Sequence, residues 1–327
     1  MSAARVVMIS NPSSGNNRRD WARVEARLRA HPEVIHHVTG SLQEAADLLP
    51  RLAAERPEIL VINGGDGTIA AVTGMILDHW PRAAHPLVMV LPGGTANMTA
   101  GDIGMATGHA KALARFSRWL EAGAPTHGAT RERHVMRVTG AADGAVRHGL
   151  FLGTGAVMQA TRYAHDNVHS RGLGGEISLG LILVRALWGL MRRDPRFYQP
   201  TQVALRVTGR ADETAREAGP MLILVASTLA RLSLGIRPFW GPPADGAIGL
   251  TAIRGGARRF GLSILSVLRG RPNRHVTRAN GYESFRGDRI ALHLDGEVNL
   301  DGELFAATRA TPLTITAEGP VRFLRPR

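Results

Sequence analysis

The chain of 327 residues contains no cysteine. It therefore has no disulfide framework, no thiolate metal site and no cysteine nucleophile, and it is compatible with a reducing compartment. Lysine is nearly as scarce, because Lys111 is the only one and arginine carries almost all of the positive charge. The formal net charge of +13 favours anionic partners such as nucleotides or phospholipid headgroups.

The sequence also lacks a long apolar run and two familiar nucleotide motifs. The apolar stretch at residues 177–191 is 15 residues long, whereas a membrane-spanning helix needs about 20. Residues 1–5 lead directly into an apolar strand pattern, which leaves no room for a secretory signal, so we expect a cytoplasmic protein. Neither a Gly-x-x-x-x-Gly-Lys-Ser/Thr loop nor a Gly-x-Gly-x-x-Gly motif after the first strand is present.

One stretch organises the first part of the chain: residues 60–68, which read Leu-Val-Ile-Asn-Gly-Gly-Asp-Gly-Thr. The apolar run predicts a buried strand, and residues 69–77, apolar at helical spacing, predict a helix after the turn. We expect Gly64, Gly65 and Gly67 to take positive φ and to bring backbone N–H groups close to a ligand. Because a helix N-terminus favours an anion, this junction predicts a phosphate site.

Asp66 lies inside this loop and leaves two interpretations open. A carboxylate repels a phosphate directly, so the first interpretation places Mg²⁺ between Asp66 and the phosphates. In the second, Asp66 only anchors the loop or caps the helix, and the glycines serve the geometry of an ordinary turn.

Two further junctions of the same kind favour the phosphate interpretation. The strand pattern at residues 87–91 breaks into Pro-Gly-Gly-Thr-Ala-Asn at 92–97, and the first strand pattern breaks into Ser-Asn-Pro-Ser-Ser-Gly-Asn at 10–16. The carboxyl ends of neighbouring parallel strands meet at one edge of an open α/β sheet, where nucleotides bind. Together with a short strand pattern that closes on Thr39, these junctions predict one shared nucleotide site.

The chain is predicted to form two domains. Alternating strand and helix patterns over roughly the first 120 residues predict a doubly wound parallel sheet with helices on both faces. Short strand patterns separated by Gly, Asp or Pro dominate after Pro125, so we predict an α/β domain at residues 1–125 followed by a β-sandwich. The expected strands of the second domain lie at residues 134–139, 146–152, 202–208, 221–227, 248–253, 289–294 and 312–317.

Two helical patterns interrupt the second domain, at residues 177–191 and 258–269. Apolar faces with flanking arginines suit docking on an anionic membrane surface, and they also suit packing on the sandwich as core helices. We favour core packing for the first helix and leave both interpretations open for the second. The arginine-rich stretch 254–289 has no interleaved exposed aromatics and no groove-reading motif, so we expect no nucleic-acid partner.

Two acidic turns occur near the end of the chain, Asp295-Gly296-Glu297 and Asp301-Gly302-Glu303. A carboxylate on a tight turn could accept the proton of a hydroxyl nucleophile, which phosphoryl transfer to an alcohol requires besides positioning and charge neutralisation. Either turn could equally be a solvent-exposed hairpin, and the spacing alone does not choose between them.

Five motifs in this order resemble the diacylglycerol kinase catalytic-domain family of lipid kinases, particularly its bacterial members. They are Asn11-Pro12-Ser13-Ser14-Gly15, Gly64-Gly65-Asp66-Gly67-Thr68, Pro92-Gly93-Gly94-Thr95-Ala96-Asn97, Ala244-Asp245-Gly246 and Asp301-Gly302-Glu303. The resemblance spans essentially the whole chain. It implies an NAD kinase-like α/β domain, a lipid-substrate β-sandwich at residues 126–307, and an active site in the cleft between them. It also implies that residues 308–327 pack back on the first domain.

The resemblance implies roles for the matching residues. The residues that would hold ATP are Asn11, Ser14, Gly15, Thr39, Gly64, Gly65, Asp66, Gly67, Thr68, Thr95 and Asn97, with Asp66 close to the Mg²⁺-phosphate centre. Asp301 or Glu303 would supply the base, and Asp295 would not. Asp245 would hold a structural Mg²⁺ together with the backbone carbonyls of Pro242 and Ala247.

The activity implied by the resemblance is the ATP-dependent phosphorylation of a lipid hydroxyl, for example that of diacylglycerol, within lipid metabolism and phospholipid biosynthesis. The partners would be a lipid substrate presented at a membrane surface and anionic phospholipid. The protein would then be cytoplasmic and peripheral at the inner membrane surface. A homodimer is also possible through an exposed strand edge.

The chain departs from the family pattern at two places. It has Ala70-Ala71 where relatives commonly have Asn-Glu, and Met98 where they often have Asp, so polar groups near the nucleotide are lost. Two alternatives therefore stand beside the lipid kinase. One is a kinase of a soluble acceptor, because NAD kinases share a loop of the Gly-Gly-Asp-Gly type. The other is a nucleotide- or lipid-binding protein without transferase activity.

Overall fold

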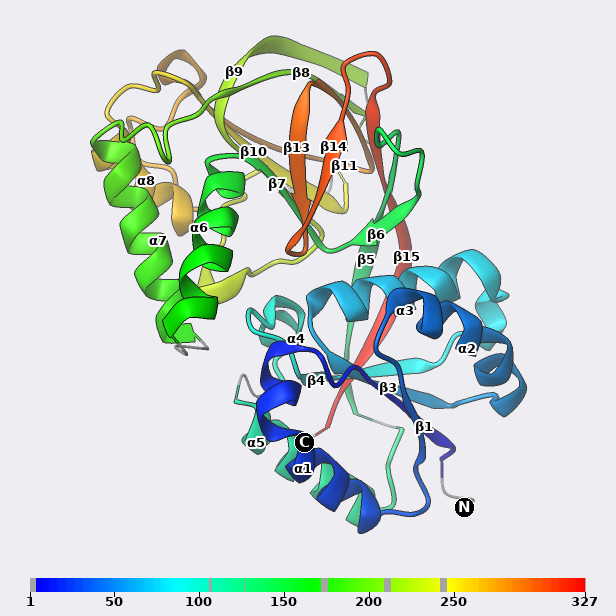
Figure 1. The fold of residues 1–327 in the computed structure, drawn as a ribbon. Coiled ribbons are helices and arrows are strands. Elements are labelled where there is room, and N and C mark those ends of the chain that lie inside the picture. Colours follow the sequence, from blue (N-terminus) through cyan, green and yellow to red (C-terminus); the bar gives the residue numbers. More distant parts are fainter. Residues whose placement is uncertain are drawn as a thin grey trace. The chain divides into compact units, whose positions relative to one another are not determined.

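The computed structural model describes residues 4–105, 108–126, 128–171, 176–208, 213–241 and 246–326 of the chain. The chain forms two compact units. Unit 1 contains Met1–Val135 and Glu318–Arg327, and unit 2 contains Met136–Ala317. The chain enters unit 2 within strand β5 (Ala129–Thr139) and returns to unit 1 within β15 (Leu313–Arg325) (Figure 1). Both crossings lie about ten residues beyond the boundaries that the sequence analysis places at residues 125 and 308.

Unit 1 is built on a parallel sheet. Its strands are β1 (Val6–Ser10), β2 (Ile35–Val38), β3 (Ile59–Gly64) and β4 (Leu87–Pro92). They lie in the order β4-β3-β1-β2 and all pair in parallel. Every residue of β1 and β3 is buried, which explains why these two strands read as continuous apolar runs rather than as alternating patterns.

Helices cover both faces of this sheet. They are α1 (Gly15–Arg29), α2 (Leu42–Glu55), α3 (Asp66–His79), α4 (Met98–Ile103) and α5 (His109–Glu121), with the short 3₁₀ turn η1 (Arg82–Ala84) before β4. Helices α2 and α3 pack together on one face, and α1 and α5 on the other (Figure 1). The N-cap predicted for α2 is present, because the Ser41 hydroxyl accepts the backbone N–H of Glu44 at 3.1 Å. The end of the chain also joins this sheet, where Phe323 of β15 pairs in parallel with Val88 of β4.

The glycine-rich turn after β3 differs from its prediction. Helix α3 begins at Asp66, so Gly67 and Thr68 belong to its first turn and not to the loop. Gly65, the N-cap residue, has a φ of −84°, and neither Gly64 nor Gly67 has a φ in the left-handed region. The expected positive φ values are therefore wrong. Close packing favours glycine at Gly64, where a Cβ would lie 2.8 Å from the Cβ of Thr68, whereas a Cβ on Gly67 would meet no atom within 4 Å.

Unit 2 is built on antiparallel strands, as the short strand patterns predict. Its strands are β6 (Arg147–Gly149), β7 (Phe151–Gly155), β8 (Thr201–Thr208), β9 (Glu213–Ser227), β10 (Ile248–Arg254), β11 (Tyr282–Gly287), β12 (Arg289–Leu294), β13 (Gly296–Leu300) and β14 (Glu303–Ala307), together with parts of β5 and β15. The pairing order is β14-β13-β7-β9-β8-β12-β15, and β10 pairs with β9 and β11. The sequence analysis expects β6 and β7 as one strand and misses β11, β13 and β14.

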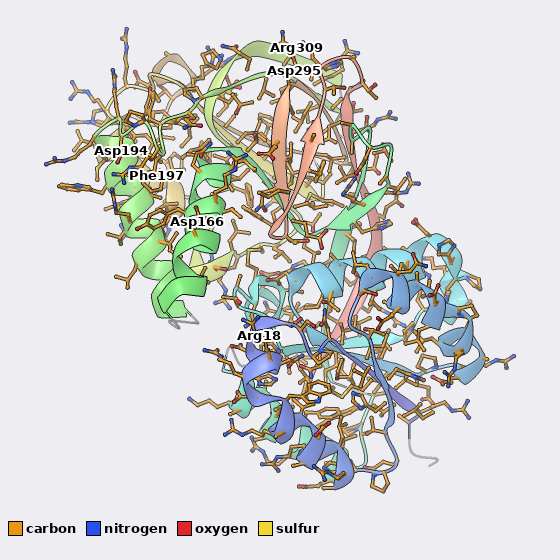
Figure 2. All side chains as sticks on the ribbon, in the orientation of Figure 1. Arg18, Asp166, Asp194, Phe197, Asp295 and Arg309 are labelled. Carbon is orange, nitrogen blue, oxygen red and sulfur yellow. The ribbon has the colours of Figure 1, made fainter. Side chains whose placement is uncertain are left out.

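Three helices gather at one side of unit 2 (Figure 1): α6 (Ala156–Arg171), α7 (Glu176–Met191) and α8 (Phe260–Leu268). Phe197, labelled in Figure 2, is almost fully buried against Ala186 and Leu190 of α7. Helix α8 packs its buried Ile264 and Val267 into a neighbouring cluster. Helix α6 is not predicted from the sequence. Within the described ranges, no helix is both long enough and apolar enough to cross a membrane.

Leu60, in the centre of β3, provides a test of the unit 1 core. It is fully buried, so Leu60→Ala should lower the free energy of unfolding by about 2–5 kcal/mol. Leu42, at the start of α2, is 42% exposed, and the same substitution there should change stability by less than about 0.5 kcal/mol. Chemical denaturation of the two variants measures the difference, and equal losses would contradict the burial of β3.

Candidate active site

The loops after β1, β3 and β4 are joined by hydrogen bonds at the carboxyl edge of the unit 1 sheet. The backbone N–H of Asn11 donates to the carbonyl of Asn63 at 2.9 Å, and the Ser14 hydroxyl accepts the N–H of Gly65 at 3.2 Å. The carbonyl of Gly93 accepts the N–H groups of Asn16 and Asn17, at 2.7 and 3.1 Å. The structure thus brings the three predicted junctions together in one bonded cluster, which we call the loop cluster.

The side chain of Asn17 lies at the centre of the loop cluster. It is fully buried, and its Nδ2 donates to the carbonyls of Asn11 and Asn63 at 2.8 and 3.0 Å. One amide therefore ties the end of β1 to the end of β3, while the backbone of the same residue holds the loop after β4. The sequence analysis does not single out Asn17. The available signal is its position in the first turn of α1, from which a short polar side chain can reach the neighbouring strand ends.

Close approach is what requires glycine in the loop cluster. A Cβ atom on Gly94 would lie 2.5 Å from the Cα of Gly65, and one on Gly15 would lie 2.3 Å from the Thr95 hydroxyl. Contacts this short do not occur in folded proteins. A larger residue at Gly94 would push the loops apart because it meets backbone, whereas one at Gly15 would displace the Thr95 side chain. The glycines therefore allow two backbones from different strands to pack directly against each other.

Asp66 holds the start of α4. The carboxylate is buried, and its Oδ2 accepts the backbone N–H of Met98 at 3.0 Å. Its Oδ1 accepts both the N–H and the hydroxyl of Thr99, each at 2.8 Å. These bonds correspond to the anchoring interpretation of Asp66, and they fix one orientation of the carboxylate in the first turn of α3. Thr99, which the sequence analysis does not select, supplies two of the three donors.

Three other residues of the predicted nucleotide set also shape the loops. Asn97 lies in the left-handed region, with a φ of 48°, and its side chain exchanges two hydrogen bonds of 2.9 Å with the backbone of Gly94. The amide of Asn11 donates to the Thr68 hydroxyl at 3.3 Å. Thr39 is buried at the end of β2, where its N–H donates to the carbonyl of Ser10 at 2.9 Å.

The loop cluster fits the phosphates of a nucleotide. A Cβ on Gly67 would meet no atom within 4 Å, so the first turn of α3 borders open space. Neither α1 nor α3 has a side-chain cap on its first N–H groups. The N–H groups of Asn16 and Asn17 in the first turn of α1 already donate to Gly93. Because N–H groups at a helix N-terminus attract anions, the first turn of α3 is the suitable phosphate cradle.

In unit 2, Asp301 occupies the tight turn between β13 and β14 and is itself in the left-handed region, with a φ of 50°. Its Oδ2 accepts the N–H of Leu150 at 2.8 Å, and its Oδ1 accepts the N–H of Phe151 at 2.9 Å. Its own N–H donates to the carbonyl of Phe151, also at 2.9 Å. Three bonds to the start of β7 therefore fix both the turn and the direction of the carboxylate.

Glu303 and Asp295 occupy different surroundings. Glu303 is exposed, and its negative charge, after the hydrogen-bonded carboxylate of Asp143, helps to raise the pKa of Arg147. Asp295 lies at the opposite end of β13 from Asp301, where its Oδ1 accepts the N–H of Arg309 at 2.7 Å (Figure 2). The two acidic turns that the sequence could not separate thus lie at opposite ends of one short strand.

The residues predicted to hold a structural Mg²⁺ precede β10 in the sequence. Asp245 and Pro242 lie outside the described residues. Ala247 is described, and its N–H donates to Oδ1 of Asp288 at 2.8 Å. Among the residues that the structure describes, no group of three or more His, Asp or Glu side chains could hold a metal ion.

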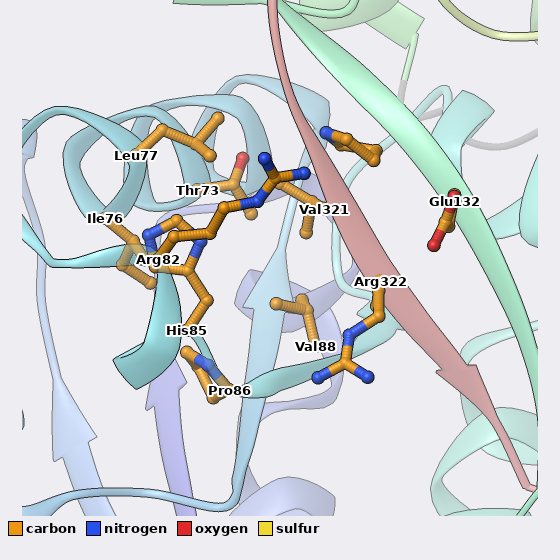
Figure 3. Close-up of a pocket in the computed structure, with 11 residues that line it drawn as sticks. Thr73, Ile76, Leu77, Arg82, His85, Pro86, Val88, Glu132, Val321 and Arg322 are labelled. Atoms are coloured by element: carbon orange, nitrogen blue, oxygen red, sulfur yellow. The ribbon is translucent and has the colours of Figure 1, made fainter.

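A pocket of about 220 Å³ in unit 1 lies away from the loop cluster (Figure 3). It is lined by Ile76 and Leu77 near the end of α3, by His85 before β4, and by Arg322 of β15. The predicted nucleotide residues follow the carboxyl ends of the strands, whereas this pocket lies near the amino end of β4. It is therefore a different surface from the candidate active site.

Comparison with known proteins supports the resemblance found in the sequence. Residues 5–122 match the family model for the diacylglycerol kinase catalytic domain. The chain is also similar to the crystal structure of a diacylglycerol kinase from Bacillus anthracis str. Sterne, with a TM-score of 0.61, 17% identity, and coverage of 96% of this chain and 94% of that chain. Two further structures from the same organism give TM-scores of 0.62 and 0.60, at 17% and 18% identity and the same coverage. No curated protein matches. The structural likeness confirms the predicted fold class, a parallel α/β domain followed by antiparallel strands.

Two glycine-to-alanine substitutions in this region should differ in their effect on stability, because a methyl group is crowded at Gly94 and has space at Gly67. Gly94→Ala should destabilise the protein by about 1–3 kcal/mol, because the new methyl group overpacks the loop cluster. Gly67→Ala should leave the melting temperature nearly unchanged, because its Cβ would enter open space. Thermal unfolding of both variants measures the effect, and a tolerated Gly94→Ala would show that the loops are not in direct contact.

Two histidines of unit 1 predict a pH dependence of stability. Burial lowers the pKa of His36, helped by the charge of His37 and opposed by Glu25. Burial also lowers the pKa of His109, although Asp20 opposes it. Since each histidine binds its proton less readily in the folded than in the unfolded chain, stability should fall as the pH drops through about 6.5. The double variant His36→Gln/His109→Gln should lose less melting temperature than the wild type between about pH 7.5 and pH 5.5, and an equal loss would refute this assignment.

Proposed function

Residues 5–122 belong to the diacylglycerol kinase catalytic-domain family, and on this basis we propose that the chain is an ATP-dependent lipid kinase. The proposed reaction transfers the γ-phosphate of ATP to a hydroxyl group of a lipid such as diacylglycerol. The match to this family supports a phosphotransferase. The loop cluster is the observation that supports a nucleotide as the phosphate donor. This proposal places the protein at the inner membrane surface, as a peripheral cytoplasmic enzyme of phospholipid biosynthesis.

The loop cluster would hold the phosphates through backbone N–H groups of the first turn of α3. The side chains of Ser14, Thr68 and Thr95 line the same loops and can donate hydroxyl hydrogen bonds. Mg²⁺, when bound with ATP, would neutralise phosphate charge, and it usually needs only one or two protein carboxylates besides phosphate and water. Asp66 is the carboxylate of the loop cluster that would meet this need.

The lipid hydroxyl must lose a proton as its oxygen bonds to the γ-phosphorus and the bond from that phosphorus to the β,γ-bridging oxygen breaks, which releases ADP. We assign the acceptance of this proton to Asp301. Its two oxygens each accept one backbone N–H, so the carboxylate has a fixed orientation, and an ionised carboxylate is an acceptor of the kind that a hydroxyl donor needs. Glu303 has an exposed and less constrained side chain, which makes it the weaker candidate for the base.

The departures from the family pattern are compatible with this proposal. Ala70 is fully buried in α3 and Ala71 is 8% exposed, so both are packed into the interior of the helix layer. Met98 meets Asp66 through its backbone N–H, a contact that does not depend on the side chain at this position. The loop cluster therefore keeps its hydrogen bonds without the polar residues that relatives have there.

The proposal is tested with γ-labelled ATP, Mg²⁺ and total lipid extract in mixed micelles, followed by separation of organic-soluble label. We expect label with the wild type and a decrease of at least about 100-fold with Asp301→Asn, the size typical for loss of a general base. The matched control is Asp295→Asn. Like Asp301, Asp295 is a turn carboxylate that accepts a backbone N–H, but it lies at the other end of β13. This control should keep full activity, and circular dichroism verifies that both variants are folded.

The other outcomes each select a different function. Turnover of NAD or another soluble acceptor without detergent or lipid would favour a kinase of a soluble acceptor. ATP binding without any Asp301-dependent transfer would favour a binding protein. Equal activity of Asp301→Asn and wild type would remove Asp301 from the reaction and leave Glu303→Gln as the next variant to measure.

A further inference from the structure

Exposed apolar side chains of the described residues are concentrated on three elements of unit 2. Eleven large apolar residues are exposed, and seven of them lie on α7, α8 and the short turn η2 (Ser233–Gly235). The seven are Leu181, Val184, Trp188, Met191, Leu234, Leu262 and Leu265. We call them the α7–α8 patch. Isolated exposed apolar residues are ordinary, whereas a concentration of this kind marks an interaction site.

The spacing along α7 places its four exposed members on one face. Leu181, Val184, Trp188 and Met191 follow each other at intervals of three, four and three residues, which confines them to an arc of about 80° around the helix. Val184 is 65% exposed and Trp188 51%. The helix therefore presents a continuous apolar stripe to its surroundings.

The opposite face of α7 is already in the core. Ala186 and Leu190 are buried against Phe197, and Leu187 packs towards the α8 cluster. A helix that is apolar on both faces normally has partners on both sides. The prediction that α7 is a core helix is thus right for one face, and the exposed stripe needs a separate explanation.

Helix α8 and turn η2 extend the stripe. A Cβ on Gly261 would lie 3.5 Å from the sulfur of Met191, so the end of α7 lies beside the start of α8. Leu262 of α8 is 62% exposed and Leu265 is 56% exposed. Turn η2, which carries the exposed Leu234, lies against α7. The members of the patch are therefore neighbours in space as well as in type.

The charges around the patch are positive. The guanidinium of Arg192 stacks over the Trp188 ring, 4.9 Å from its centroid. Exposed Arg258 and Arg259 precede α8, and exposed Arg269 follows it. Asp194, which follows α7, accepts hydrogen bonds from Arg196 and is held near Arg185, so its charge is compensated. An apolar face with Trp and Leu and a rim of arginine suits a surface that is apolar inside and anionic outside.

We propose that the α7–α8 patch docks on the surface of a bilayer that contains anionic phospholipid. The apolar side chains would enter the boundary between headgroups and acyl chains, and the arginines would contact phosphate groups. This inference deepens the proposed function, because a lipid kinase must reach an acceptor that resides in a membrane. It explains both the exposed stripe and the sign of the surrounding charge, whereas burial against a second copy of the chain would bring two arginine rims together.

Flotation with lipid vesicles tests the proposal in the absence of ATP. The wild type should float with vesicles of phosphatidylcholine mixed with phosphatidylglycerol, and it should bind much less to phosphatidylcholine alone or at high salt. The variant Val184→Gln/Leu262→Gln should lose at least about tenfold of this partitioning. The matched control, Leu42→Gln/Val146→Gln, changes two exposed apolar residues outside the patch and should bind like the wild type.

Quenching of tryptophan fluorescence by brominated lipids tests whether the α7–α8 patch touches the bilayer, and it needs only the apolar substitution Trp188→Phe. Trp188 is one of five tryptophans, and its exposed ring should account for most of the quenching on anionic vesicles. Trp188→Phe should therefore bind vesicles normally but lose this quenching. Normal flotation of Val184→Gln/Leu262→Gln, or unchanged quenching in Trp188→Phe, would overturn the proposal. So would a lipid-free dimer that the patch variant dissociates, because the patch would then face a second copy.

Activity on a short-chain diacylglycerol below its critical micelle concentration separates this proposal from the function on which it rests. The patch variant should phosphorylate the monomeric substrate like the wild type and fail only on vesicles. If the wild type phosphorylates no lipid in either form, the proposed function is wrong. Vesicle flotation then still tests whether the α7–α8 patch binds a membrane.

Discussion

The direct contact between two glycine backbones, at Gly65 after β3 and Gly94 after β4, is the constraint on which the candidate active site depends. The loops can approach this closely only because Gly94 has no Cβ, since a Cβ there would lie 2.5 Å from the Cα of Gly65. The approach places the first turn of α3 beside the loop that leads to α4. Asp66 then reaches the start of α4 across this contact. Any separation of the two loops would break those bonds and leave the N–H groups of Met98 and Thr99 without their acceptor, which is costly for buried donors.

Asn17 extends the same constraint to the first strand. Its buried amide binds carbonyls at the ends of β1 and β3, and its backbone binds the loop after β4. The three loops are therefore joined into one hydrogen-bonded unit, and the open space around Gly67 lies at its surface. Rigid N–H donors are what phosphate binding needs, because a preorganised cradle loses little entropy when the ligand arrives.

The parts of this arrangement that follow from local patterns can be read from the sequence. Continuous apolar runs in β1, β3 and β4 identify buried parallel strands, and the glycine breaks after them identify the edge where the site lies. The role of the glycines could not be read, because positive φ and close approach favour the same residue and only the contact between distant loops decides between them. The partner of Asp66 lies 32 residues away, and no periodicity indicates such a bond. Strands β13 and β14 are not predicted from the sequence, because they are short and bordered by charged turns.

The roles of the individual carboxylates are the part of the site that is hardest to predict from the sequence. Asp66, Asp295 and Asp301 all follow or precede glycine, and in the structure all three accept backbone N–H groups. Asp66 and Asp301 are each held on both oxygens by two adjacent backbone N–H groups, and what separates Asp301 is that its own backbone is in the left-handed region. A residue that costs backbone strain and is fixed on both oxygens is oriented more strictly than a turn requires, and strain of this kind is concentrated at functional sites. Asp66 costs no such backbone strain, and its carboxylate matters through the loops that it holds together, because its removal would leave the buried N–H groups of Met98 and Thr99 without their acceptor.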